Sequence, residues 1–483
     1  MPSKETKSPP TFSPELHKVV ARLSHNADYD GYGVGNLFRG DSMHKSSLRS
    51  LIAFTVVLGF LTITAPLFAA GKESLLYSFN DNGADGYNPY SSLVFDTKGN
   101  LYGTTAHGGA HNGGTVFQLT PENGAWTETI IYSFCSVTGC TDGLAPYAGL
   151  TFDTAGNLYG TTLNGGAYTS ACEGSGCGTV FELSPGTNGT WTETVLHSFA
   201  DVGKGGSNPE ASLIFDARGN LYGTTYAGGA YGYGTAFRLA PGGNGAWTEK
   251  VLYTFCSLAN CTDGNNPWAS LIMDAAGNFY STTYGGGANG YGTVFQLVPG
   301  SHDTWTENVL YSFAGNGKDG YAPEASLIFD AAGNLYGTTL LGGASGKGCG
   351  GYGCGTVFEL SPGTNGTWTE NVLYNFCSVR GCADGFGPQA GLISDAAGSL
   401  FGTTYAGGSS GKGCDGYGCG TVFRLTLGAK GKWKEHVLHK FKPKATDGYW
   451  PYAGLIFDAS GNLYGTTIYG GAYANGTVFE ITP

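Results

Sequence analysis

The segment Leu213-Ile-Phe-Asp-Ala-Arg-Gly-Asn-Leu-Tyr-Gly-Thr-Thr225 decides the fold, because seven near-copies of it occur along the chain. The aspartates of the copies are Asp96, Asp153, Asp216, Asp274, Asp330, Asp395 and Asp458, at steps of 57, 63, 58, 56, 65 and 63 residues. A period of this length indicates repeated supersecondary units, each too small to bury a core without its neighbours.

Each repeat contains four runs that are typical of β-strands. In the third repeat they are residues 212–216, 221–225, 235–239 and 247–255, which we name strands a, b, c and d. Short runs of β-branched and aromatic residues bounded by Gly, Asn and Pro favour antiparallel hairpins. Outside the N-terminal 70 residues no segment has a helical period. Seven such units predict an all-β fold, a seven-bladed β-propeller with four antiparallel strands per blade.

The two ends of the repeat region indicate how the ring closes. Residues 73–79 align with strand d of the other repeats, whereas Gly476–Ile481 form a strand c that no strand d follows. We therefore predict that strand 73–79 pairs with the C-terminal blade, which removes the open edges of the sheets. A linear β-solenoid is the alternative, but it would have no use for this permutation.

Composition and charge exclude one class of partner. Of the 483 residues 84 are glycine, and the net charge is −12. Residues 1–70 carry seven Lys/Arg and five Asp/Glu, which leaves 17 basic against 31 acidic residues downstream, or −14. A surface of this sign does not attract a phosphate backbone, so we expect no nucleic-acid partner.

The N-terminal region has the pattern of an export signal. Leu51–Ala70 is apolar, follows His44, Lys45 and Arg49, and ends in two alanines. We expect residues 1–42 to be a disordered extension or a mis-assigned start, residues 43–70 a signal peptide, and residues 71–483 the propeller. A single membrane anchor is the alternative, because twenty residues can span a bilayer. We expect a secreted, periplasmic or cell-surface monomer with no membrane span in the mature chain.

The cysteines agree with export, because an even set in an exported chain favours disulfides. They form six C-x4-C pairs: Cys135/Cys140, Cys172/Cys177, Cys256/Cys261, Cys349/Cys354, Cys377/Cys382 and Cys414/Cys419. Closing so short a loop stabilises by only about 2 kcal/mol, so the disulfides would stiffen loops rather than hold the fold. Zinc bound by Cys349/Cys354 together with Cys377/Cys382 is the alternative.

The recurring Gly-Asn-Leu-Tyr-Gly-Thr-Thr, followed by Gly-Gly and Gly-Thr-Val-Phe, resembles the GloVer-type tandem-repeat family of exported bacterial proteins. The likeness covers about residues 72–483. It implies a secreted protein built from such units and implies no particular activity. A weaker likeness links Asp-x-x-Gly-Asn-Leu-Tyr to NHL-type propellers and to streptogramin lyase propellers, and the latter imply an enzymatic alternative.

The b–c and d–a loops share one face of a propeller, vary in length and carry all six cysteine pairs, so we expect the binding face there. The d–a loops repeat Asp-Gly-x-x-Pro. Its aspartates are Asp85, Asp142, Asp263, Asp319, Asp384 and Asp447, and the third repeat has Gly205 instead. A ring of carboxylates would suit calcium, which prefers oxygen ligands. Ordinary turn chemistry, in which Asp bonds its own backbone, is the favoured interpretation.

The position directly after that proline changes from repeat to repeat. Its residues are Tyr90, Tyr147, Glu210, Trp268, Glu324, Gln389 and Tyr452, which we call the ring residues. They precede strand a, the expected innermost strand, so they should surround the mouth of the channel. Flat apolar rings with carboxylates and an amide suit a carbohydrate or another small polar ligand. The alternative is that they only plug the channel.

The prediction of function therefore rests on the b–c and d–a loops and on the ring residues. The leading hypothesis is an exported, non-catalytic module that binds carbohydrate or an extracellular or envelope partner. A lyase or glycoside hydrolase at the channel mouth is an alternative, with Glu210 and Glu324 as the candidate acid pair. A purely structural envelope protein is the third hypothesis. His107 and His111 lack a third ligand nearby in the sequence for a metal site.

Two further residue types recur on strand d. The glutamates of the Trp-Thr-Glu motif, such as Glu128 and Glu193, are expected to be solvated charges on the outermost strand. The tryptophans of the same motif are expected to pack between blades.

Overall fold

The computed structural model describes residues 71–170, 172–200, 205–344, 349–408, 414 and 416–483. The segments predicted as extension and signal, residues 1–70, lie outside the described residues. None of the helices in the described ranges is both long enough and apolar enough to cross a bilayer.

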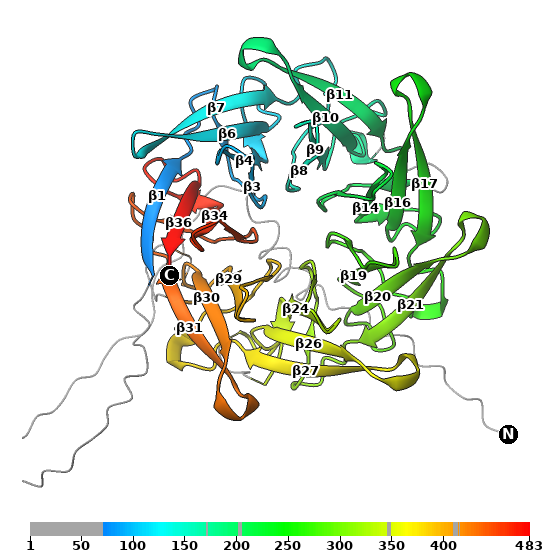
Figure 1. Ribbon diagram of the computed structural model, residues 1–483, viewed down its shortest axis with the longest axis vertical. Coiled ribbons are helices and arrows are strands. Elements are labelled where there is room, and N and C mark those ends of the chain that lie inside the picture. Colours follow the sequence, from blue (N-terminus) through cyan, green and yellow to red (C-terminus); the bar gives the residue numbers. More distant parts are fainter. Residues whose placement is uncertain (1–70, 171, 201–204, 345–348, 409–413, 415) are drawn as a thin grey trace, which may run out of the picture. The chain divides into compact units, whose positions relative to one another are not determined.

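The described chain forms seven four-stranded antiparallel sheets, arranged radially around a centre (Figure 1). Each sheet is a blade with the strand order a, b, c, d from the centre outward, and all seven blades lie in a single ring. The predicted seven-bladed β-propeller is confirmed.

The strands of the blades, in chain order from blade 1 to blade 7, have the following bounds. Strands a are β3 (Val94–Phe95), β8 (Thr151–Phe152), β13 (Ile214–Phe215), β18 (Ile272–Met273), β23 (Ile328–Phe329), β28 (Ile393–Ser394) and β33 (Ile456–Phe457). Strands b are β4 (Leu101–Thr105), β9 (Leu158–Thr162), β14 (Leu221–Thr225), β19 (Phe279–Thr283), β24 (Leu335–Thr339), β29 (Leu400–Thr404) and β34 (Leu463–Thr467). Strands c are β6 (Thr115–Glu122), β10 (Thr179–Pro185), β16 (Thr235–Pro241), β20 (Thr293–Pro299), β26 (Thr356–Pro362), β30 (Thr421–Leu427) and β36 (Thr477–Thr482). Strands d are β7 (Ala125–Ser133), β11 (Trp191–Ser198), β17 (Trp247–Thr254), β21 (Trp305–Ser312), β27 (Trp368–Asn375), β31 (Trp433–Lys440) and, for blade 7, β1 (Lys72–Ser78).

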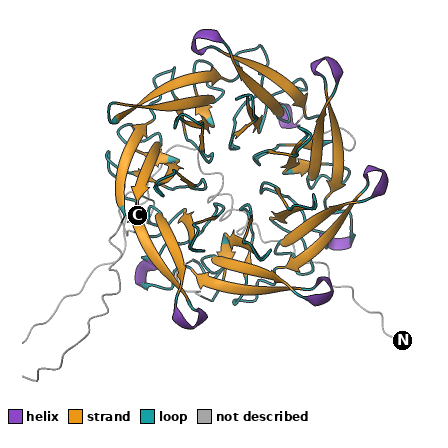
Figure 2. Ribbon diagram, viewed as in Figure 1, coloured by secondary structure: helices purple, strands orange, loops and turns teal. Residues whose placement is uncertain are grey.

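Short 3-10 turns occur at two kinds of place, the c–d hairpins and the cysteine loops (Figure 2). Those of the c–d hairpins are η2 (Thr187–Gly189), η3 (Gly243–Gly245), η5 (Ser301–Asp303), η6 (Thr364–Gly366) and η8 (Ala429–Gly431). Those of the cysteine loops are η1 (Cys172–Gly174), η4 (Ala259–Cys261) and η7 (Arg380–Cys382).

The ring closes through the first and last strands, as the sequence predicted. β1 pairs antiparallel with β36 in a register that sets Lys72 opposite Thr482 and Glu73 opposite Ile481. Blade 7 therefore takes its outermost strand from the start of the described chain and its other three strands from the end.

The core is built from residues that the repeat places between and within blades. Gly223 of strand b faces Phe237 of strand c, and a Cβ there would lie 2.8 Å from the Phe237 Cζ atom. This contact explains the glycine at the centre of strand b in six blades, whereas blade 4 has Ser281 there, opposite Phe295. Tryptophans of strand d pack on tyrosines of the preceding blade, for example Trp191 on Tyr102 at 6.2 Å between ring centroids. The prediction that they pack between blades is confirmed.

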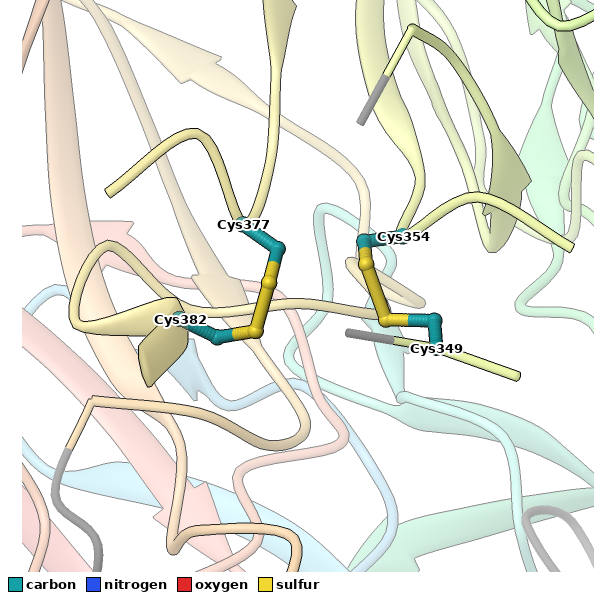
Figure 3. A group of neighbouring side chains, drawn as sticks. All are labelled: Cys349, Cys354, Cys377 and Cys382. Carbon is teal, nitrogen blue, oxygen red and sulfur yellow. A yellow bond between two sulfur atoms is a disulfide. The ribbon is translucent and has the colours of Figure 1, made fainter. Parts of the chain in front are cut away.

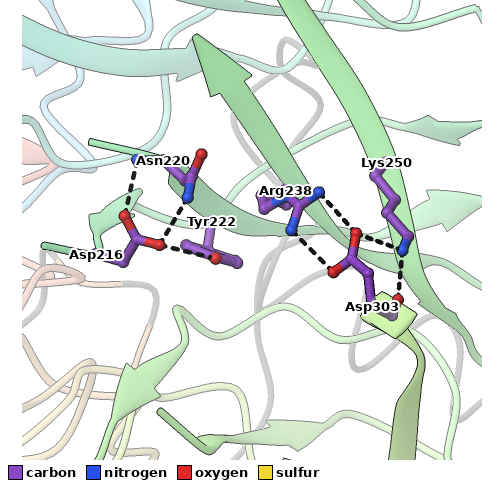
Figure 4. Close-up of polar contacts among 6 residues, drawn as sticks. All are labelled: Asp216, Asn220, Tyr222, Arg238, Lys250 and Asp303. Carbon is purple, nitrogen blue, oxygen red and sulfur yellow. Dashed lines mark hydrogen bonds and ion pairs between the residues drawn. The ribbon is translucent and has the colours of Figure 1, made fainter. Parts of the chain in front are cut away.

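Strand a is shorter than predicted, two residues instead of five. The residue that ends it is Asp216, whose carboxylate organises the a–b turn (Figure 4). Its Oδ1 accepts the backbone N–H groups of Arg218 and Asn220, each at 2.9 Å. Its Oδ2 accepts the Asn220 side-chain amide at 2.7 Å and the Tyr222 hydroxyl at 3.1 Å.

We predict that Asp216→Ala destabilises the propeller by about 2 kcal/mol, because it leaves several donors around a partly buried carboxylate without an acceptor. The matched control is Asp303→Ala. Asp303 pairs with Arg238 and Lys250 (Figure 4) but is 43% exposed, so its loss should cost less than about 1 kcal/mol. Urea unfolding measures both variants, and an equal or larger loss for Asp303→Ala would refute the assignment.

The b–c and d–a loops share one face, because they pair with each other. Four two-stranded sheets join them: β2 (Gly86–Tyr87) with β5 (His107–Gly108), β12 (Gly206–Ser207) with β15 (Ala227–Gly228), β22 (Gly320–Tyr321) with β25 (Leu341–Gly342), and β32 (Gly448–Tyr449) with β35 (Tyr469–Gly470). In the other three repeats a single bridge does the same, such as Leu144 with Asn164. We call this surface the loop face.

Candidate functional site

All seven ring residues line one cavity of about 120 Å³. Each blade contributes a three-residue segment to its wall: residues 90–92, 147–149, 210–212, 268–270, 324–326, 389–391 and 452–454. The first residue of each segment is the variable one, and the other two are Ala, Ser or Gly. The structure thus brings together every ligand candidate that the sequence suggested.

Small side chains let the seven segments converge and bind one another. The Ser212 backbone N–H donates to the Ser270 hydroxyl at 3.0 Å, and the Ser270 N–H donates to Ser326 at 3.1 Å. Thr224 of strand b donates to the carbonyl of Ala269 in the next blade at 3.0 Å. Because these bonds run from blade to blade, the wall is fixed and the ring side chains are held at set positions.

One side of the cavity is aromatic. Tyr90 stacks on Tyr147 with 4.6 Å between ring centroids and meets Tyr452 edge-on at 5.2 Å. The fourth aromatic ring residue, Trp268, stands apart from these tyrosines, between Glu210 and Glu324 in the order of the blades, and its ring centroid lies 5.2 Å from that of Tyr226. These rings present the flat apolar surfaces that a sugar ring packs against.

The other side is polar and incompletely bonded. Glu324 is 8% exposed and its Oε2 accepts the amide of Gln389, itself 6% exposed, at 3.2 Å. The Oε1 atoms of both side chains are buried and have no hydrogen-bond partner. A buried polar atom without a partner is costly, so this part of the wall is suited to a ligand that supplies donors.

Burial also sets the charge of the cavity. It raises the pKa of Glu210 to about 8, against a hydrogen bond with Trp268 that lowers it. Burial raises the pKa of Glu324 to about 8 as well, with a contribution from the nearby Glu210. Burial and the two glutamates raise the pKa of Tyr452 well above its ordinary value. At neutral pH both carboxyls are therefore mostly protonated.

The aspartates of Asp-Gly-x-x-Pro serve their own loops. The Asp142 Oδ2 accepts the Ser136 N–H at 2.8 Å, the Ser136 hydroxyl at 2.9 Å and the Tyr132 hydroxyl at 3.0 Å. Equivalent bonds hold Asp263 and Asp384. Within the described ranges the six aspartates do not form a group of three with oxygens within 4.8 Å of one another. Their geometry is that of turn chemistry.

All six predicted disulfides are present. Three brace d–a loops: Cys135–Cys140, Cys256–Cys261 and Cys377–Cys382. Three brace b–c loops: Cys172–Cys177, Cys349–Cys354 and Cys414–Cys419. In blade 5 the two kinds meet, and Cys349–Cys354 lies beside Cys377–Cys382 with all four sulfur atoms within 4.8 Å of one another (Figure 3). The structure thus brings the four cysteines of the zinc alternative together, but as two disulfides.

The prediction that the disulfides would only stiffen loops is wrong for the b–c loops. The second cysteine of each of these pairs, Cys177, Cys354 or Cys419, is 0% exposed and belongs to the hydrophobic core. The sequence spacing shows the loop that each pair closes, but not the apolar contacts that its sulfur atoms make. These three disulfides therefore join the b–c loops to the core as well as bracing them.

In the d–a loops the pairs are only partly buried, as expected of loop braces, except that Cys382 is 8% exposed. Cys140 also connects the two kinds of loop through its backbone. Its carbonyl accepts the N–H of Gly143 in its own loop and the N–H of Gly166 in the b–c loop of the same face, each at 3.0 Å. The Cys135–Cys140 disulfide thus holds a backbone acceptor on which the neighbouring loop depends.

The prediction of solvated strand-d glutamates is wrong. Each is partly buried against the d–a loop of the preceding blade and has a buried Oε1 without a hydrogen-bond partner. In six junctions it faces the loop aspartate, and in one of these the pair is Asp447 with Glu73. We call the other five the carboxyl pairs: Asp85–Glu128, Asp142–Glu193, Asp263–Glu307, Asp319–Glu370 and Asp384–Glu435. Burial is the main cause that raises the pKa of these glutamates to about 7 or 8, and the charge of the neighbouring aspartate adds to it.

Two further sets of exposed residues on the loop face were not predicted from the sequence. The b–c loops carry tyrosines that are 37–60% exposed: Tyr168, Tyr231, Tyr233, Tyr352, Tyr417 and Tyr473. Three disulfide-braced d–a loops carry an apolar residue that is 49–55% exposed: Val137, Leu258 and Val379. For three of the tyrosines, Tyr233, Tyr352 and Tyr417, the sequence signal is a recurring Gly-Tyr-Gly in the b–c loops. His107 and His111 belong to no three-ligand group in the described part of the chain.

The Gloeobacter/Verrucomicrobia repeat family matches the chain over residues 62–172, 168–414 and 349–483. No curated protein matches it significantly.

The solved structures that are similar to it include the following three. A proposed 6-phosphogluconolactonase from Bacteroides uniformis is 13% identical, with a TM-score of 0.43 over 82% of this chain and 89% of that chain. A proposed oxidoreductase (glucose dehydrogenase) from Thermus thermophilus is 14% identical, with a TM-score of 0.37 over 85% and 99%. An ancestral GH74 enzyme is 11% identical, with a TM-score of 0.52 over 85% of this chain and 51% of that chain, and this likeness concerns the fold alone.

Proposed function

The chain belongs to the Gloeobacter/Verrucomicrobia repeat family, and we propose that this member is an exported, non-catalytic module that binds carbohydrate on its loop face. The observation that carries the proposal is the cavity lined by the seven ring residues. The scaffold around them repeats almost unchanged, whereas their side chains alternate between aromatic rings, carboxyls and an amide. A purely structural plug would not need this variation.

The size of the cavity limits what enters it. Its volume of about 120 Å³ is well below the roughly 300–1,000 Å³ of pockets that enclose a drug-sized ligand. The part bound inside would therefore be small, such as the end of a sugar chain. The exposed tyrosines of the b–c loops offer stacking surfaces for sugars further along the chain.

The chemistry of the wall favours a neutral, hydroxylated ligand. The protonated carboxyls of Glu210 and Glu324 donate as well as accept, so they suit hydroxyl groups, which also do both. An anionic ligand would find no basic side chain among the lining residues.

The same carboxyls weigh against the paired-acid hydrolase. Glycoside hydrolysis by two carboxyl groups needs one of them ionised, as nucleophile or base. Burial raises the pKa of both Glu210 and Glu324 to about 8, so at neutral pH both are mostly protonated and the ionised form that this mechanism needs is the minor one. Binding without turnover fits this arrangement better.

We predict that Trp268→Ala weakens sugar binding at least ~10-fold, because it removes an aromatic surface from the cavity wall. A glycan array followed by calorimetry on the bound sugar measures the effect. The control is Leu427→Ala, which alters an exposed residue of a c–d hairpin and should leave affinity unchanged. An array without any bound glycan, or an unchanged affinity for Trp268→Ala, would reject the proposal, and the former result would favour a structural role.

A further inference from the structure

The junction between blades 6 and 7 contains three side chains that are common metal ligands. Glu73 comes from the closing strand β1, His439 from β31, and Asp447 from the loop after β31. One ligand atom of each lies within 4.8 Å of those of the other two. The His439 Nε2 and Asp447 Oδ1 atoms are 3.2 Å apart.

This junction departs from the usual pattern of the repeat. In five of the other six blades the strand-d position of His439 is a tyrosine that donates a hydrogen bond to the loop aspartate. Tyr77, for example, donates to the Asp85 Oδ2 at 3.0 Å and to the Glu128 Oε2 at 3.3 Å. A phenol has one O–H proton to share between the two carboxyl groups, whereas an imidazole supplies a nitrogen ligand to a cation.

The third repeat is a natural comparison. At the junction between blades 2 and 3, strand d also has a histidine at the position of His439. This residue is His197, and its Nε2 lies 3.8 Å from the Glu249 Oε2. The loop aspartate is replaced there by Gly205, so only two ligands remain. In the described part of the chain the imidazole and both carboxylates occur together only at the junction of blades 6 and 7.

The surroundings hold the three side chains in place, and the His439 Nε2 and Asp447 Oδ1 atoms are hydrogen-bonded to each other, a contact that a bound ion would replace. The Lys442 N–H donates to the Asp447 Oδ2 at 3.0 Å, which turns Oδ1 toward His439. The ring of Phe441 packs edge-on against the imidazole, with centroids 4.8 Å apart. The Glu73 Oε1 is buried and has no hydrogen-bond partner. Such supporting contacts orient ligands at metal sites.

The donor set selects the class of ion. Calcium and magnesium take oxygen ligands, whereas one imidazole with two carboxylates suits zinc and other divalent first-row transition ions. Ligands about 2.0–2.2 Å from a tetrahedral zinc lie roughly 3.3 Å apart, close to the His439–Asp447 distance. A cation would also remove the repulsion between Glu73 and Asp447.

We propose that Glu73, His439 and Asp447 bind one divalent transition ion, Zn²⁺ in the first instance, with solvent in the remaining position. Because Glu73 belongs to the closing strand and the other two ligands belong to blade 6 and the loop that follows it, the ion would clamp the ring at its point of closure. The proposal is independent of the carbohydrate site.

The test is calorimetric titration of the full chain with Zn²⁺ under non-reducing conditions, which keep the cysteines in their disulfides. The decisive variant is His439→Tyr, because it restores the Tyr–Asp–Glu junction that the fold already contains at Tyr77. We expect one Zn²⁺ per wild-type chain, a higher Tm in its presence, and at least ~100-fold weaker binding by His439→Tyr.

The matched control is His197→Tyr, which removes the histidine of the two-ligand junction and should leave zinc binding unchanged. Co²⁺ provides a second readout, since a visible absorption band in the wild type that disappears in His439→Tyr reports the imidazole ligand directly. A wild-type chain that does not bind at 100 µM Zn²⁺, or equal binding by a folded His439→Tyr variant, would overturn the proposal.

Discussion

Removing residues 71–79 should prevent the ring from closing and abolish cooperative folding. The deletion takes away β1, which pairs with β36 along its length, and exposes β36 as an edge. It also removes Phe79, which is 0% exposed and packs against Phe117 of blade 1 with 5.1 Å between ring centroids. Loss of one buried phenylalanine alone costs about 3–5 kcal/mol, a large part of the roughly 5–15 kcal/mol that stabilises a typical domain. Circular dichroism and calorimetry of a chain beginning at Asn80 measure the effect.

A circular permutation separates closure from mere chain length. The register places Glu73 opposite Ile481, as Glu249 lies opposite Leu239 in blade 3. Pro483 therefore corresponds to Pro241, and Gly71 to Trp247. Moving residues 71–79 behind Pro483 through the five-residue turn 186–190 should give an ordinary c–d hairpin and restore a Tm within a few degrees of the parent. A truncated chain that folds as stably as the permuted one would show that closure is dispensable.

The fold was predictable because its determinants are local and occur seven times. The strand b sequence Leu-Tyr-Gly-Thr-Thr, its flanking turns and the displaced strand d at residues 73–79 are all visible in the repeat. The length of strand a was overestimated, because Asp216 and its equivalents start the a–b turn early through their side-chain hydrogen bonds. Residues 212 and 213 carry strand-like side chains, but the backbone of Ser212 bonds the next blade.

The site was predictable in position but not in chemistry. The variable residue after the proline identified the ring, yet its protonation depends on burial in a cavity that only the packed blades create. The prediction that the strand-d glutamates are solvated was wrong for a related reason. Strand d is the outermost strand of its own blade, but Glu128 and its equivalents face the d–a loop of the preceding blade, and Glu128 meets Tyr77 across 51 residues of sequence.

The carboxyl pairs lead to the second large prediction, that the propeller is more stable at pH 5 than at pH 8.5. Burial raises the folded-state pKa of the paired glutamates from 4.5 to about 8, or to about 7 for Glu370. A carboxyl group whose pKa is raised on folding binds its proton more tightly in the folded state than in the unfolded state. It therefore makes its full contribution to stability at pH values below its unfolded-state pKa. That stability is lost as the pH rises toward the folded value. The window is therefore about pH 4.5 to 8, and Glu210 and Glu324 act in the same direction.

Other groups act against this trend and set the optimum. Burial lowers the pKa of His197 from 6.5 to about 4, so its contribution is present above pH 6.5 and is lost as the pH falls. Burial, and then the charges of Lys434 and Arg424, also lower the pKa of His436, but two histidines do not outweigh seven glutamates. Hydrogen bonds lower the pKa of the turn aspartates Asp96, Asp153, Asp216, Asp274 and Asp330. Stability should therefore fall again below about pH 4, which leaves a maximum near pH 5.

Calorimetric Tm values measured from pH 4 to pH 9 at constant ionic strength, with EDTA present, test this prediction. After allowance for partial exposure, each pair contributes on the order of 1 kcal/mol, so Tm should fall by about 5 °C between pH 5 and pH 8.5. The matched variant carries Glu→Gln at 128, 193, 307, 370 and 435, which imitates the protonated form. It should equal the parent near pH 5 and lose much less stability at pH 8.5. A parent chain that is more stable at pH 8.5, or an equally steep decline in the glutamine variant, would mean that these junctions do not hold protonated glutamates.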